Sequence, residues 1–202
     1  MSPLDDISPR AAFELLERAI GYALGAVRAV SADVLAARTP CADWDLGALL
    51  HHVNDSLELL HRCIGAGLDG PAGSVWSAAD PVGVFRARAT RLIGACGSHR
   101  PTHHAVRVGR YPLAIGPIAA TGALEVAVHG WDISRATDET RPIPSELADD
   151  LLWLCPPLVV DAGRHRLFAP PVPLPPTASA SDRLVAFLGR DPTGSSAAPP
   201  AR

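Results

Sequence analysis

The sequence predicts an all-α protein: a four-helix bundle with short extra helices and a Pro-rich C-terminal segment. Two observations lead to this fold class. Four long segments carry apolar residues at helical spacing, and proline-containing breaks separate these segments. Such helices bury their apolar faces against one another, which makes a bundle. A chain of 202 residues suits one domain, placed at 8–192, with a tail at 193–202 that we expect to be disordered.

Helix start and stop signals delimit the elements of the first half. Ser8 followed by Pro9 combines a capping side chain with a first-turn proline, and Asp80 followed by Pro81 repeats the signal. The elements predicted in this half are a helix over 9–31, a helix from Asp43 or Asp45 to Ile64, a Gly/Pro/Ser loop over 65–79, and a helix from Pro81 to Cys96 with Gly97 as its stop.

The second half is predicted in the same way. Residues 98–116 contain two prolines and alternate weakly, which indicates an extended loop with room for a short strand. The elements that follow are a helix from Gly116-Pro117 to Thr137, a fifth helix over 144–160, an extended Pro-rich stretch over 169–178, and a short helix capped by Ser181 or Asp182 that ends at Gly189.

Composition excludes several classes of partner and compartment. The formal net charge is −3, and the 18 basic residues are scattered arginines, which favours neither a nucleic acid nor an anionic membrane. The four cysteines form no CxxC pair, so a zinc ribbon and a thioredoxin-like motif are disfavoured. The start of the chain lacks the apolar core of a signal peptide, and we expect a reduced, cytoplasmic protein.

The helix predicted after Gly116-Pro117 carries the chemistry. Glu125, His129 and Asp132 are four and three residues apart, so they share one face, while the other faces are apolar as well. A helix that is apolar all round is buried, and a buried carboxylate is costly unless it is paired, protonated or bound to a metal. Glu125 and His129 can reach one cation. The alternative is that they hydrogen-bond to each other or to a neighbouring helix.

A metal needs a third ligand from elsewhere in the chain. The helix that ends near Ile64 offers His51, His52 and His61. His61 lies nearest the apolar centre of that helix and His52 lies at its edge, so periodicity does not choose among them. The other histidines are His99, His103, His104 and His165.

Three blocks of sequence resemble one protein family. They are TPCADWDLGALLHHV (39–53), ALEVAVHGWDISRAT (123–137) and DRLVAFLGRDP (182–192). They resemble the DinB-like superfamily and, within it, the N-terminal domain of mycothiol-dependent maleylpyruvate isomerase and related mycothiol S-transferase-like proteins. The resemblance covers about 8–192 and implies a DinB-like metal-binding helical bundle. It implies that His52, eight residues after Trp44, is a ligand together with Glu125 and His129.

The implied site has two imidazoles and one carboxylate on a divalent metal. Zinc is the first choice, and nickel, iron or manganese would tolerate the same ligands. Three protein ligands leave a position open for a thiol or a water, which would be the reacting group. Asp132 has two equally weighted roles: it orients His129 or holds a substrate group, or it forms a salt bridge to Arg135 or another arginine.

The resemblance implies a metal-dependent enzyme, an S-transferase or isomerase, that uses a low-molecular-weight thiol such as mycothiol to attack or isomerise a small electrophile. One alternative is a thiol-independent, metal-dependent hydrolase, lyase or cyclase that tailors secondary metabolites. Another is a non-catalytic metal-binding protein of stress response or ligand binding. The isomerase has a further C-terminal domain that contributes an arginine, and we expect no such domain within 202 residues. Its specific isomerisation is therefore not expected.

The remaining expectations concern partners and the wall of the pocket. We expect a monomer or homodimer that binds a small electrophile and a small thiol, and neither nucleic acid nor membrane. Cys41 is interpreted as a small packing residue rather than a nucleophile. Candidate anion contacts are Arg107, Arg110 and Arg135, and candidate wall residues are Tyr111 and Trp131, for which core packing is the alternative.

Overall fold

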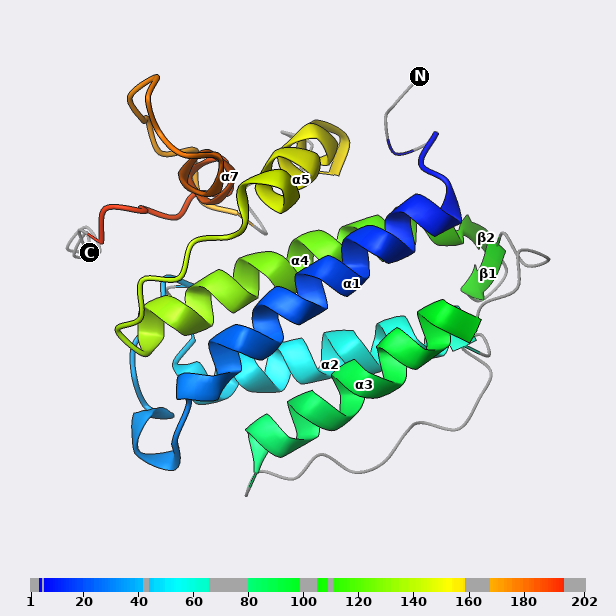
Figure 1. The fold of residues 1–202 in the computed structure, drawn as a ribbon, viewed down its shortest axis with the longest axis horizontal. Helices are drawn as coiled ribbons and strands as arrows, with labels where there is room; N and C mark the ends of the chain where they lie inside the picture. The colour runs from blue at the N-terminus through cyan, green and yellow to red at the C-terminus, as the bar shows by residue number, and fades with distance from the viewer. Residues whose placement is uncertain are drawn as a thin grey trace.

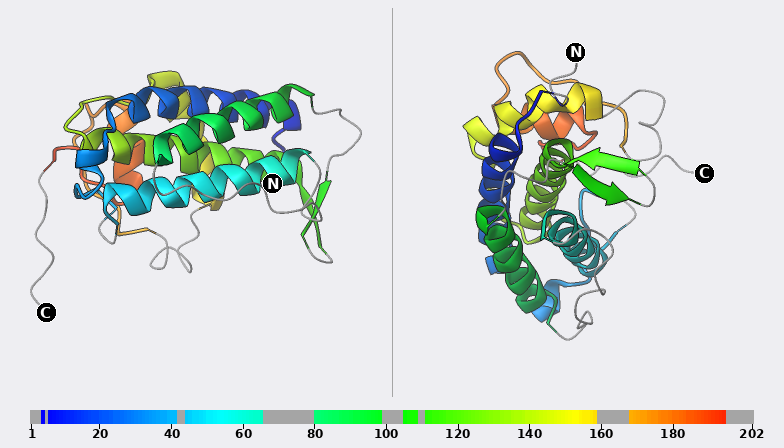
Figure 2. Two further views of the ribbon diagram at one scale, coloured as in Figure 1. Left: turned by 90° about the horizontal axis from the view of Figure 1, so that it is seen from below. Right: turned by 90° about the vertical axis from the view of Figure 1, so that its right-hand side faces the viewer.

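The computed structural model describes residues 4, 6–41, 44–65, 80–98, 105–108, 111–158 and 168–194, with the backbone alone at 105–108, 111–112 and 157–158. The described residues include four long helices that pack side by side (Figure 1): α1 (Pro9–Ala26), α2 (Leu46–Gly65), α3 (Pro81–Ser98) and α4 (Ile115–Ala136). Helix α4 contacts α1 and α2, and α3 closes the ring between those two. The end-on view in Figure 2 shows this two-by-two arrangement, which confirms the predicted all-α bundle.

The predicted capping signals begin three of these helices. Ser8 accepts a hydrogen bond from the backbone of α1, Asp45 from that of α2 and Asp80 from that of α3, in each case from the N–H three residues on. Helix α1 ends at Ala26, earlier than predicted, and the chain continues through the 3₁₀ turns η1 (Val27–Ala29) and η2 (Ala32–Val34). Helix α3 runs through Gly97 to Ser98, so Gly97 is not its stop.

Helix α4 lies in the core, as its all-round apolar character predicts. Nearly all of its residues from Ala119 onward to Ser134 are buried. Two glycines allow its neighbours to approach closely. A Cβ atom at Gly130 would lie 3.2 Å from the Cα atom of Ala23 in α1, and one at Gly122 would lie 2.6 Å from the Leu60 side chain in α2. The absence of side chains at these points therefore sets the helix spacing around the candidate site.

The segment 98–116, predicted as an extended loop with room for a short strand, contains two paired strands among its described residues. Strands β1 (Ala105–Val108) and β2 (Tyr111–Ala114) pair antiparallel, with Ala105 opposite Ala114. The weak alternation of apolar and polar residues in this segment therefore corresponds to two short strands. The hairpin lies at one end of the bundle and leads directly into α4 (Figure 1).

Two shorter helices follow the bundle: α5 (Ser145–Leu158) and α7 (Ala180–Phe187), which pack on each other. The predicted cap of α7 is wrong, because Ser179 accepts the hydrogen bond from the backbone of Asp182. Ser181 is buried and accepts a hydrogen bond from the backbone N–H of Ile143 instead. Helix α7 ends at Phe187, and Gly189 reverses the chain at a φ of 83°.

Several other predicted segments lie only partly within the described residues. Residues 168–175, within the stretch predicted to be extended and Pro-rich, form neither helix nor strand, and residues 176–177 form a turn. Of the tail at 193–202, residues 195–202 lie outside the described part, as does the loop over 66–79.

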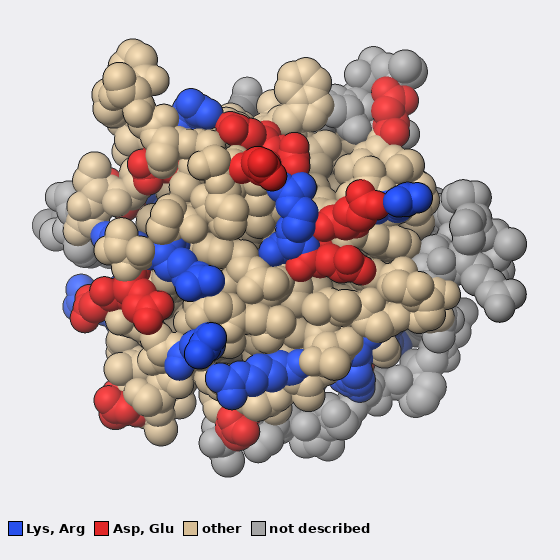
Figure 3. Space-filling model, in the orientation of Figure 1, with Lys and Arg blue, Asp and Glu red and all other residues tan. Residues whose placement is uncertain are grey.

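No helix in the described ranges is long and apolar enough to span a bilayer. The four cysteines, all within those ranges, form no disulfide. On the face drawn in Figure 3, arginines and acidic side chains are interspersed.

Candidate metal centre

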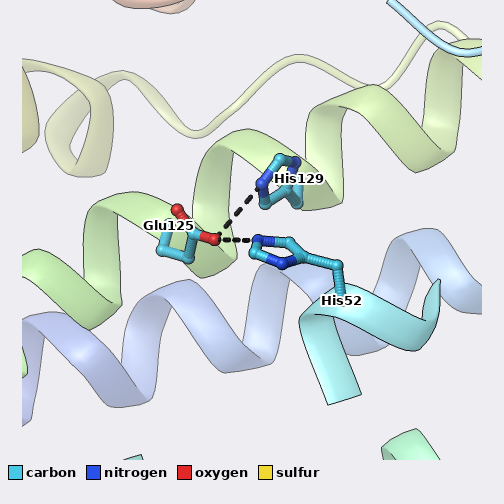
Figure 4. Close-up of side chains that lie close together, drawn as sticks. All are labelled: His52, Glu125 and His129. Carbon is cyan, nitrogen blue, oxygen red and sulfur yellow. Dashed lines mark hydrogen bonds and ion pairs between the residues drawn. The ribbon is translucent and has the colours of Figure 1, made fainter. Parts of the chain in front are cut away.

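His52, Glu125 and His129 lie together between α2 and α4. One ligand atom from each lies within 4.8 Å of the others. Oε1 of Glu125 hydrogen-bonds to Nε2 of His52 and lies 3.3 Å from Nε2 of His129 (Figure 4). His129 is 7% exposed, whereas His52 and Glu125 are 36% and 34% exposed. The cluster therefore has a buried side on α4 and an open side toward solvent.

The turn before α2 positions His52. The hydroxyl of Thr39 donates to the carbonyl of Trp44 and accepts from the backbone N–H of Cys41, which fixes the TPCxxW turn. The Trp44 ring then lies against His52, with ring centroids 4.5 Å apart and planes tilted by 42°. His52 and His129 meet edge to face at 5.1 Å. Trp44 thus limits the rotation of the imidazole that α2 contributes.

The other candidate histidines of α2 lie outside this cluster. His51 is about half exposed and pairs with Asp55 at 3.1 Å on the outer side of the helix. His61, nearest the apolar centre of α2 by periodicity, is half-buried and does not join the cluster. His99, His103, His104 and His165 lie outside the described residues.

Asp132 links His129 to an arginine near the end of the described chain. The Nδ1–H of His129 donates to Oδ2 of Asp132 over 2.9 Å. Arg190 donates to both oxygens of the same carboxylate, over 3.2 Å from Nε and 2.9 Å from Nη2. Asp132 therefore contacts both His129 and an arginine at the same time. The partner is not Arg135, whose guanidinium lies over the Trp131 ring at 5.7 Å.

Arg190 was not among the residues that sequence reasoning selected. It follows Gly189, where an added Cβ would lie 2.6 Å from the carbonyl oxygen of Ala169, so only glycine fits this turn. The chain reversal places Arg190 beside Asp132, which is fully buried. The signal that could have found Arg190 is the LGRDP end of the third block, which the resemblance already included.

Burial and charge pairing oppose each other across this network. Burial alone would raise the pKa of the Glu125 carboxyl, but hydrogen bonds and charges from His129 and His52 outweigh it and hold that pKa well below its ordinary value. Burial would lower the pKa of His129, yet Asp132 and Glu125 raise it to about 9. Burial would also raise the pKa of Asp132, but Arg190 and His129 lower it. The network therefore favours ionised carboxylates.

A pocket of about 260 Å³ opens beside the cluster. Its wall is largely apolar and comes from three parts of the chain: Trp44 before α2, Leu124 and Val128 on α4, and Phe168 and Leu188 near the C-terminus. Cys41, interpreted above as a packing residue, is half-buried in this wall. Trp131 is buried and does not line the pocket, and the side chains of Tyr111, Arg107 and Arg110 lie outside the described part.

A second hollow adjoins the cluster on the outer side of α2. It is an open groove lined by Trp44, Gly47, Ala48, His51, His52 and Asp55. Trp44 and His52 border both this groove and the apolar pocket. The candidate metal centre therefore borders two openings, one on each of these sides.

Residues 16–134 match the family described as the mycothiol maleylpyruvate isomerase N-terminal domain, part of the DinB-like superfamily. The chain belongs to this family. It is a mycothiol-related, metal-binding DinB-like protein, and the family origin suggests enzyme activity. Two uncharacterized proteins of Mycobacterium tuberculosis, from strains CDC 1551 and H37Rv, are each 28% identical over 169 residues, or 80% of this chain and 87% of their own. No solved structure matches.

The range matched by the family contains the candidate ligands but only part of the pocket wall. Trp44, His52, Glu125, His129 and Asp132 all fall within residues 16–134. Phe168, Leu188 and Arg190 lie beyond it, so part of the pocket wall is outside the matched domain.

Proposed function

We propose that His52, Glu125 and His129 hold one divalent cation, and that the protein uses it with a low-molecular-weight thiol such as mycothiol to attack or isomerise a small electrophile. The observation that carries the proposal is the convergence of these three side chains at the edge of a pocket. Family membership supports a small thiol as the partner.

The donor set fits a divalent cation. Two imidazole nitrogens and one carboxylate oxygen, close enough to share an ion, are typical of catalytic zinc sites and also suit nickel, iron or manganese. The hydrogen bond from Nδ1 of His129 to Asp132 directs Nε2 toward the other two ligands. Carboxylate partners of this kind orient metal-bound histidines in many proteins.

In the proposed reaction, the bound ion would activate the thiol, and the side chains of the protein would hold the ligands and receive the substrates. A bound divalent cation with an open position would lower the pKa of a thiol and make it nucleophilic at neutral pH. Asp132 keeps the proton of His129 on Nδ1 and fixes the ring plane, while Arg190 keeps Asp132 ionised. The apolar wall excludes water and receives the electrophile, and the open groove along α2 offers a second approach for the thiol.

Two openings on either side of His52 favour a reaction with two substrates. A hydrolase or lyase that acts without a thiol needs one substrate pocket, whereas a thiol transfer brings two molecules to the same atom. The shared border of the pocket and the groove at Trp44 and His52 therefore supports the thiol-dependent function over the thiol-independent alternative.

Metal analysis of the purified, untagged protein is the first test. We expect one divalent ion per chain in the wild type and none in His52→Ala or Glu125→Ala, with helicity unchanged by circular dichroism. His51→Ala is the matched control, because His51 is adjacent on α2 but points to Asp55. Full metal retention in both ligand variants would reject the ligand set.

Turnover with and without thiol is the second test. The metal-loaded protein should consume an activated alkene or an epoxide faster with mycothiol than without it, after subtraction of the uncatalysed reaction. Equal rates in both conditions would remove the thiol from the function and favour the thiol-independent enzyme. No turnover by a protein that retains metal would favour the non-catalytic alternative.

A further inference from the structure

We infer, on the basis of the function proposed above, that the electrophile is small, apolar and uncharged, and that the segment 168–190 selects it. The pocket volume of about 260 Å³ lies slightly below the range of roughly 300–1,000 Å³ that is usual for ligand pockets, so the substrate is small. Its chemical class follows from the wall of the pocket and from its charges.

The wall away from the candidate ligands presents hydrocarbon and aromatic surface. Five apolar side chains form it: Trp44, Leu124, Val128, Phe168 and Leu188. Trp44 and Phe168 are partly buried against the core, and Leu124, Val128 and Leu188 are buried. A charged group placed against such a wall loses its hydration without gaining a partner, which is costly.

Arg190 is the one arginine among the described residues that line the pocket, and its interactions are directed into the protein. Its three guanidinium nitrogens each donate a hydrogen bond: Nε and Nη2 to Asp132, and Nη1 to the carbonyl of Leu188. The buried Asp132 carboxylate matches its charge. Arg190 is therefore a positioning residue that holds the segment 168–190 against α4, and it does not supply an unmatched cation to bind an anionic substrate.

The other charges in the pocket also favour an uncharged substrate. Glu125 is the other charged lining residue, and its Oε1 atom contacts the imidazoles of both His52 and His129. That carboxylate charge offers an anionic substrate no partner. A divalent cation together with an ionised thiol would cancel it and leave the pocket neutral overall. Neither state favours a carboxylate-bearing substrate over a neutral one of the same shape.

Binding of two matched probes tests this inference. The ¹⁵N-labelled protein is titrated with methyl benzoate and with sodium benzoate at constant ionic strength, once metal-free and once loaded with zinc and saturated with mycothiol. Chemical shifts of the Trp44 indole N–H report occupancy. Methyl benzoate should bind at least about 30-fold more tightly in both states, because an unpaired carboxylate is costly to bury.

Two lysine variants test the role of charge. Thr121 lines the pocket, is exposed, and donates its hydroxyl to the backbone four residues earlier in α4. Thr90 on α3 is its matched control, because it is also exposed and donates the same type of hydrogen bond, but it is not a lining residue. Thr121→Lys should raise benzoate affinity by about tenfold, because it adds a cation at the edge of the pocket, whereas Thr90→Lys should leave it within about twofold.

Three results would overturn the inference: benzoate binding as tightly as the ester, no shift at Trp44 with either probe, or equal responses of the two lysine variants. Failure of the proposed function is distinguishable from these. Absence of thiol-dependent turnover would remove the thiol, whereas the preference for the ester in the metal-free protein is measured without thiol or turnover.

Discussion

Replacement of Arg190 by methionine tests the network behind the metal centre most directly. The substitution keeps the length of the buried aliphatic stem and removes the guanidinium, which leaves the Asp132 carboxylate fully buried with His129 as its remaining partner. Removal of one member of a buried ion pair typically costs about 3–5 kcal/mol of unfolding free energy. For a chain of this length, each kcal/mol lowers Tm by about 2–4 °C, so Tm should fall by about 6–20 °C.

Thermal and urea unfolding followed by circular dichroism measure this loss. Arg183→Met is the matched control, because Arg183 pairs with Asp149 over the same distance of 2.9 Å, but with the two side chains 46% and 57% exposed. An exposed pair of this kind contributes about 0–1 kcal/mol. Adding Asp132→Asn to Arg190→Met removes the stranded charge and should recover part of the stability. If Arg190→Met costs no more than Arg183→Met, the buried network is not a stabilising element.

Further predictions concern helix packing and the cysteines. Gly130→Ala should destabilise the protein by about 1–3 kcal/mol, because the new methyl group would crowd the backbone of α1, whereas Gly94→Ala, with open space around it, should stabilise α3 by up to about 1 kcal/mol. Equal urea midpoints of the two variants would contradict the close α1–α4 packing. Burial raises the pKa of the Cys96 thiol to about 12, so at pH 8 it should be neutral and react with iodoacetamide only on unfolding. The half-buried Cys41 should account for the first labelled site in the native protein, and Cys41→Ser should abolish that phase.

Local chemistry predicts a large part of this fold. Ser8, Asp45 and Asp80 act as caps because a short polar side chain just before a helix can accept a hydrogen bond from a first-turn N–H that has no partner within the helix. The spacing of Glu125, His129 and Asp132 predicts a shared face, since a helix repeats every 3.6 residues or so. These features depend on neighbours in sequence, and the structure places them as expected. Ser181 fails as a cap for the converse reason, because its hydroxyl is engaged by the distant Ile143.

The rest depends on contacts between distant segments. Periodicity placed His52 at the edge of its helix. An edge position faces the core only when a second helix packs beside it, which the pattern of one helix does not show. The family resemblance alone therefore selected His52. Arg190 reaches Asp132 because Gly189 reverses the chain after α7, and no helical pattern in the sequence encodes that return. The sequence allowed one short strand within 98–116 but did not predict the pairing of two, because the alternation is weak and each strand has only four residues.

The pocket has two origins in the chain. Its floor, with the three candidate ligands, belongs to the helices of the matched domain. Phe168, Leu188 and Arg190 come from a later segment, in which Arg190 pairs with Asp132 of α4. Exchange of that segment between relatives could re-specify the substrate without disturbing the ligands of the ion, provided that the arginine and its aspartate partner are kept. Under the proposed function, the residues that hold the ion and the residues that contact the substrate would then be able to change independently.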